Sequence, residues 1–128
     1  MKYVISLSLI IVGVIHLLPL SGALSSERLV ALYGVAISDP NLEILMRHRA
    51  VLFGLLGTFF IYAAFSPVYQ LLAFIAGLLS IISFMYLATT VGDYNAQINR
   101  VYMADIVALV CLLGGFFAYI YNSVMARQ

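Results

Sequence analysis

Four long apolar segments, at about residues 3–20, 42–65, 69–89 and 99–121, dominate this sequence. A helix needs about 20 apolar residues to cross the hydrocarbon core of a bilayer, so each segment is a candidate span. Charged residues make up only 9% of the chain, against about 25% in an ordinary soluble domain, which leaves little polar surface for water. We therefore predict an all-α integral membrane protein, a single domain over residues 1–128 folded as a four-helix up-down bundle.

The connection between the first two spans, residues 21–39, is mixed rather than apolar. Residues 25–28 (SSER) predict the start of a short helix, and Gly34 predicts its end. This helix is too short to cross a membrane, so we expect it to lie at the interface. Asp39 and Pro40 suit the start of the second span, because Asp caps free N–H groups and Pro fits the first turn.

Nearly all ionisable groups are predicted to gather at one end of the bundle. Four alternating spans place residues 21–49 and 92–105 on the same side of the membrane. That end carries the acids and histidines and most of the arginines: Glu27, Asp39, Glu43, Asp93, Asp105, Arg28, Arg47, Arg49, Arg100, His16 and His48. The opposite end has only Lys2, Arg127 and the chain termini.

Asp105 lies inside the fourth span, where an unpaired carboxylate costs roughly 2.5–3.5 kcal/mol on insertion scales. We predict that it faces the bundle and pairs with Arg47 or Arg49, while Glu43 and Arg47 pair along their own helix. Two interpretations stay open. The cluster is either a structural ion-pair network that holds the helices together, or a pocket in which arginines donate to an anionic or carbonyl-bearing head group.

The predicted ligand-binding residues all belong to this polar end: Arg47, His48, Arg49, Asp105, His16, Glu43 and Asn99. Asn95 and Asn99 either cap the fourth span or line the site, and capping is favoured. No Ser/His/Asp, Walker or GxGxxG arrangement occurs, so no catalytic residue is predicted and a binding role is favoured over an enzyme. A net charge of +1 without a basic stripe argues against nucleic-acid binding.

His16 and His48 are the candidates for a haem b site, since two imidazoles can ligate haem axially. His48 lies between two arginines, and histidines at the polar end of a bundle are more often hydrogen-bonded to neighbours. We therefore predict no cofactor and no metal, with haem b or a quinone as alternatives.

Small residues predict close helix contacts. Gly13 shares a face with His16, and Ala50, Gly54 and Gly57 share a face of the second span. The second-span face can pack within the chain or form a homodimer.

The orientation signals conflict. Lys2 favours a cytoplasmic N-terminus, whereas the count of Lys and Arg on each side favours the reverse. Because Arg47, Arg49 and Arg100 are expected to be neutralised at helix edges, we favour cytoplasmic termini and a periplasmic polar end.

Asp39-Pro40-Asn41, residues 47–50 (RHRA) and the Gly54/Gly57 face resemble small bacterial DoxX-like four-helix membrane proteins. The resemblance covers most of the chain as four spans with an arginine opening the second. It implies quinone-linked redox chemistry in some members and no settled activity in many others.

Our leading hypothesis is a bacterial inner-membrane binding or accessory protein. Its polar end would hold a lipid or quinone head group or dock a partner subunit. The alternatives are a redox protein with haem b between His16 and His48, and a small oligomeric transporter or channel with Asp105 as a proton or ion site.

Overall fold

The computed structural model describes residues 1–126, and the chain is all-helical within this range. Its elements are α1 (Lys2–Leu17), the short 3-10 helix η1 (Leu18–Ala23), α2 (Ser26–Tyr33), α3 (Pro40–Phe65), α4 (Pro67–Val91) and α5 (Ala96–Met125). Four helical stretches, namely α1 with η1, α3, α4 and α5, are long and apolar enough to cross a membrane. The prediction of an all-α chain with four span-length helices is confirmed. Arg127, predicted at the terminal end, lies outside the described residues.

The helix ends follow the capping signals of the sequence. The Ser25 side chain accepts a hydrogen bond from the backbone N–H of Arg28 and starts α2. Gly34 ends this helix in the left-handed region, with φ 64°. Asp39 Oδ1 accepts from the backbone N–H of Asn41 at 2.8 Å and starts α3. The predicted short helix between the first two spans is therefore present.

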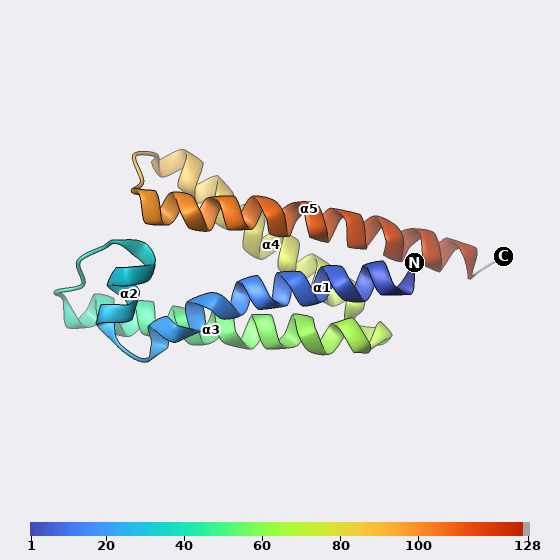
Figure 1. The fold of residues 1–128 in the computed structure, drawn as a ribbon, viewed down its shortest axis with the longest axis horizontal. Helices are drawn as coiled ribbons and strands as arrows, with labels where there is room; N and C mark the ends of the chain where they lie inside the picture. The colour runs from blue at the N-terminus through green and yellow to red at the C-terminus, as the bar shows by residue number, and fades with distance from the viewer. Residues whose placement is uncertain (127–128) are drawn as a thin grey trace.

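Chain direction reverses from each long helix to the next along the long axis of the molecule (Figure 1). The N-terminus and the C-terminal part of α5 lie at one end, and α2 lies at the other. α1 packs against both α3 and α5, whereas α4 crosses obliquely and packs against α3 and α5. Within residues 1–126, the backbones of α3 and α5 do not come close to each other. α1 therefore separates α3 from α5.

Helices α1 and α3 cross closely at Gly13 and Gly57. A Cβ atom built on Gly57 would lie 2.7 Å from the carbonyl oxygen of Gly13, and one built on Gly13 would lie 2.9 Å from that of Gly57. Only glycine allows backbones to approach this closely. The small-residue face of the second span thus packs against α1 of the same chain.

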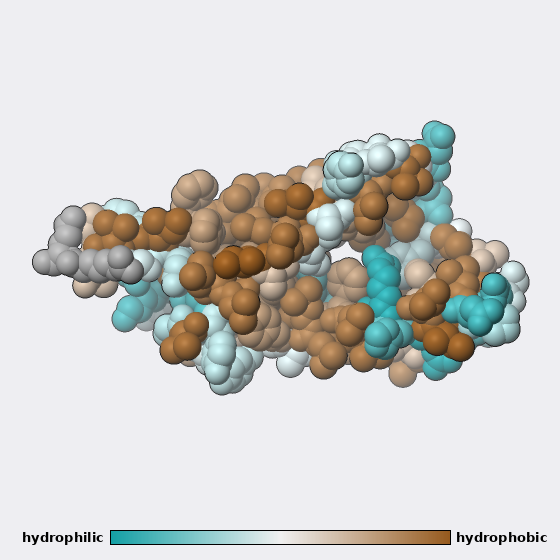
Figure 2. Space-filling model, turned by 180° about the vertical axis from the view of Figure 1, so that it is seen from behind, coloured by the Kyte–Doolittle hydropathy of each residue, from teal (hydrophilic) through white to brown (hydrophobic). Residues whose placement is uncertain are grey.

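The middle of the molecule is a closed apolar core, and the outer faces of the long helices are also apolar. The core side chains with no exposed surface include Leu9, Val12, Phe60, Phe74 and Leu112. Figure 2 shows hydrophobic residues along the length of one face and hydrophilic residues mostly at the end that carries α2. An apolar exterior of this kind is suited to a lipid environment.

Candidate functional site

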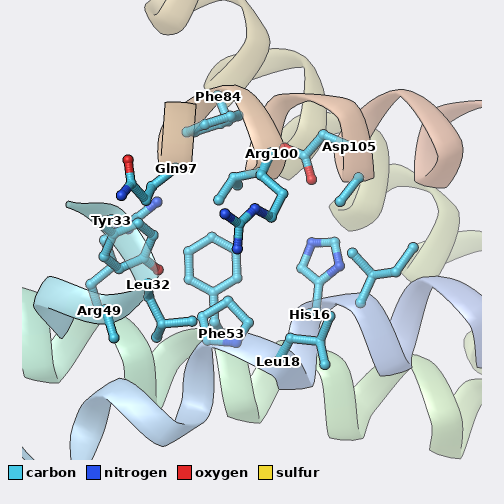
Figure 3. A pocket seen from close by; sticks show the side chains of 15 residues that line it. His16, Leu18, Leu32, Tyr33, Arg49, Phe53, Phe84, Gln97, Arg100 and Asp105 are labelled. Carbon is cyan, nitrogen blue, oxygen red and sulfur yellow. The ribbon is translucent and has the colours of Figure 1, made fainter. Parts of the chain in front are cut away.

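A cavity of about 190 Å³ opens at the α2 end of the molecule. It lies between α3 and α5, with α1 at its base, α2 beside it and Phe84 contributed by α4 (Figure 3). Figure 2 shows a hollow at this end of the molecule. Most of the lining is apolar, and the polar lining residues are His16, Tyr33, Arg49, Gln97, Arg100 and Asp105. Three of the predicted binding residues, His16, Arg49 and Asp105, are therefore brought together.

Arg49 is held in the cavity by aromatic rings. Its guanidinium carbon lies 4.9 Å from the ring centroid of Phe53, one turn further along α3, and 5.3 Å from that of Tyr33 on α2. These are cation–π distances. Within the described residues the Arg49 guanidinium forms no ion pair and no side-chain hydrogen bond. Its N–H groups therefore remain available to a ligand.

Arg100 and Asp105 reach the cavity from α5 (Figure 3). The predicted ion pair between Asp105 and Arg47 or Arg49 is wrong, because no ion pair involving Asp105 occurs in residues 1–126. Arg49 lines the same cavity but is drawn to the aromatic rings of α2 and α3. The separation of α3 from α5 leaves space where the pair was expected.

Arg47 and Glu43 form the predicted pair along α3, at 3.2 Å, but they do not line the cavity. Arg47 Nε instead donates to the carbonyl of Ala23 at 2.9 Å, and a terminal nitrogen donates to that of Leu24 at 3.4 Å. Both carbonyls belong to the connection between η1 and α2. Arg47 thus fastens this connection to α3, and it lies outside the cavity lining.

His16 forms the base of the cavity and is only 2% exposed. Its Nδ1–H donates to the carbonyl of Val12 at 2.9 Å, and its Nε2 lies 3.2 Å from the hydroxyl of Ser80 on α4. The ring stacks on Phe53 at 5.6 Å and meets Phe60 edge-on at 5.0 Å. Both ring nitrogens are therefore engaged within the helices.

His48 and Asn99 are exposed and lie outside the cavity lining, so neither joins the predicted site. A haem held between His16 and His48 does not fit this arrangement, because the His16 nitrogens are occupied and His48 points to another face of α3. Asn95, rather than Asn99, caps α5, since its Oδ1 accepts from the backbone N–H of Ile98 at 2.8 Å.

Comparisons of this chain with protein-family models, with curated proteins and with solved structures find no match. The resemblance to DoxX-like proteins stays a prediction.

The cavity also contains residues that are not among the predicted binding residues. Gln97, Val101 and Ala104 recur at helical spacing with Asp105, and Phe53 lies four residues after Arg49. These periodicities were available in the sequence. The sequence places Arg100 at the polar end but gives no site for Tyr33 or Phe84, because their positions depend on how α2, α4 and α5 pack.

Proposed function

We propose that this chain is a small bacterial inner-membrane binding protein whose cavity holds the head group of a membrane lipid or quinone. The observation that carries the proposal is the presence of two arginines, Arg49 and Arg100, in one cavity without an ion-pair partner among the described residues. A guanidinium presents a planar fork of N–H donors that suits phosphate, carboxylate or carbonyl oxygens.

The shape of the cavity supports an amphipathic ligand. Its volume of about 190 Å³ is below the roughly 300–1,000 Å³ of pockets that enclose whole drug-sized ligands. A head group therefore fits inside, while an apolar tail would run along the hydrophobic exterior of the helices. The apolar walls, including Phe53 and Phe84, suit the part of the molecule that joins head and tail.

The proposed setting is the cytoplasmic membrane of a bacterium, with the termini cytoplasmic and the α2 end periplasmic. The packed core between the cavity and the opposite end, which includes Leu9, Phe60 and Leu112, argues for a one-sided binding site and against a transport path. Membrane lipids are then the expected partners, and a membrane protein that receives the lipid would make this an accessory subunit.

Native mass spectrometry of the gently solubilised protein tests the proposal, with an absorption spectrum of the same sample to detect a quinone. The variants are Arg49→Ala, Arg100→Ala and the double variant. The matched control is Arg28→Ala, because Arg28 is exposed on α2 and does not line the cavity. Each lost charged hydrogen bond should weaken binding by about 1.5–3 kcal/mol, or roughly 10- to 150-fold. A double variant that retains every bound lipid of the wild type would refute the proposal.

A further inference from the structure

The cavity contains charged groups of both signs that form no ion pair with each other. Arg100 and Asp105 are five residues apart on α5, which corresponds to about 7.5 Å along the helix axis. Arg49 stands on the opposing helix α3, and within residues 1–126 Asp105 forms no ion pair with it or with any other cation. Figure 3 shows the Asp105 carboxyl directed into the cavity from α5. A ligand must therefore satisfy two separate kinds of group.

His16 cannot act as a partner of Asp105, because its two ring nitrogens are hydrogen-bonded to Val12 and Ser80. A purely anionic head group would satisfy Arg49 and Arg100 but would place a second negative charge near Asp105. A neutral quinone would accept from the arginines but would offer nothing positive to the carboxylate. Either ligand would leave Asp105, in a mostly apolar cavity, without a directly bonded partner of opposite charge, which is costly.

Building on the proposed function, we infer that the ligand is a zwitterionic phospholipid whose head group carries a primary ammonium, as in phosphatidylethanolamine. Its phosphate binds the guanidinium groups of Arg49 and Arg100, and its ammonium binds the carboxylate of Asp105. Such a head group offers an opposite charge to each of the three charged groups at once.

The choice of a primary over a quaternary ammonium rests on hydrogen bonding and space. A carboxylate accepts N–H hydrogen bonds, and charge-assisted bonds of this kind are short and strong. A trimethylated ammonium has no N–H to donate and is bulkier, in a cavity of only about 190 Å³. The cavity should therefore discriminate between two head groups of the same net charge.

Competition measured by native mass spectrometry tests this inference. The purified protein is mixed with equal amounts of phosphatidylethanolamine and phosphatidylglycerol with identical acyl chains, and then with phosphatidylethanolamine and phosphatidylcholine. The wild type should prefer phosphatidylethanolamine by at least about tenfold in both mixtures. Asp105→Asn should reduce the preference over phosphatidylglycerol to near unity while the total lipid bound persists, because the arginines still hold the phosphate.

Asp93→Asn is the matched control, because Asp93 is exposed in the turn before α5 and lies outside the cavity lining. Its backbone φ of 48° is one that asparagine tolerates. This variant should keep the wild-type preference. Circular dichroism and size-exclusion profiles identify any variant that fails to fold. The comparison with phosphatidylcholine needs no variant and tests the inference on the wild type alone.

The outcomes separate this inference from the proposed function. The inference of a zwitterionic ligand would be refuted if the wild type bound the competing lipids equally. It would also be refuted if Asp105→Asn kept the wild-type preference. If lipid binding were still lost in the Arg49 and Arg100 variants, the proposed head-group site would stand. If lipid binding were independent of both arginines, the proposed head-group site and the zwitterionic ligand would both be refuted.

Discussion

The crossing of α1 and α3 makes a sharp prediction about Gly57. In Gly57→Ala, the new Cβ would lie 2.7 Å from the carbonyl oxygen of Gly13 and 3.0 Å from the backbone nitrogen of Leu17. Both atoms are backbone atoms, which cannot turn aside as a side chain can. The two helices must move apart by several tenths of an ångström, and the contacts along their crossing loosen.

The magnitude follows from comparison with a second glycine. Gly114→Ala places its Cβ in open space, with nothing within 4 Å. Both substitutions gain the same helix propensity, about 1 kcal/mol in favour of alanine. The difference between the two variants therefore isolates the steric effect, for which overpacking of about 1–3 kcal/mol is expected. Gly54→Ala should fall between them, because its Cβ meets the flexible end of Leu20 at 2.5 Å rather than backbone.

The assay is reversible unfolding in mixed micelles by titration with sodium dodecyl sulfate, followed by far-ultraviolet circular dichroism. The denaturing midpoint should be highest for Gly114→Ala, intermediate for Gly54→Ala and lowest for Gly57→Ala. If Gly57→Ala unfolds at the same or a higher detergent fraction than Gly114→Ala, the close α1–α3 crossing is not the packing of the folded protein.

Three further predictions concern polar contacts. Arg47→Ala should lower the free energy of unfolding by about 1–3 kcal/mol, because it releases the η1–α2 connection from α3. Amide hydrogen exchange in α2 should become faster, and unchanged exchange would contradict this role of Arg47. Ser80→Ala leaves Nε2 of His16 without its partner and should lower the free energy of unfolding by about 1–3 kcal/mol in the same detergent titration. An unshifted midpoint would mean that this hydrogen bond does not stabilise the fold. Asn95→Ala removes the α5 cap and the hydrogen bond from Nδ2 to the carbonyl of Tyr33, so it should cost about 1–3 kcal/mol. The exposed Asn99→Ala should stay within about 0.5 kcal/mol, and equal effects of the two variants would argue against both Asn95 contacts.

Much of the fold was predictable from local chemistry. Apolar length alone predicts four span-length helices, and single residues such as Ser25, Gly34 and Asp39 mark where helices begin and end. These signals are local, because a cap or a left-handed turn involves only a few neighbouring residues. The glycine face of α3 was also readable, although its partner α1 could be found only from the structure.

The candidate site was only partly predictable, because it depends on which helices touch. Arg47 and Arg49 are two residues apart and equally polar, yet they point to different faces of α3 and have different roles. The sequence could not show that Ala23 and Leu24 offer carbonyls to Arg47 or that Tyr33 folds back onto Arg49. Each of these contacts joins different helical elements and has no local signature.

The distribution of ion pairs helps decide between a structural network and a binding site. A network that holds helices together needs pairs between helices, yet the one ion pair in residues 1–126, Arg47 with Glu43, lies within α3. The long helices are joined instead by glycine contacts, aromatic packing and hydrogen bonds such as that of His16 with Ser80. Arg49, Arg100 and Asp105 contribute no ion pair to this packing. Arg49 and Asp105 are half-buried, and desolvating charged groups without partners is costly. Three charged groups that face one cavity and do not pair are better explained by a charged ligand than by the stability of the helices.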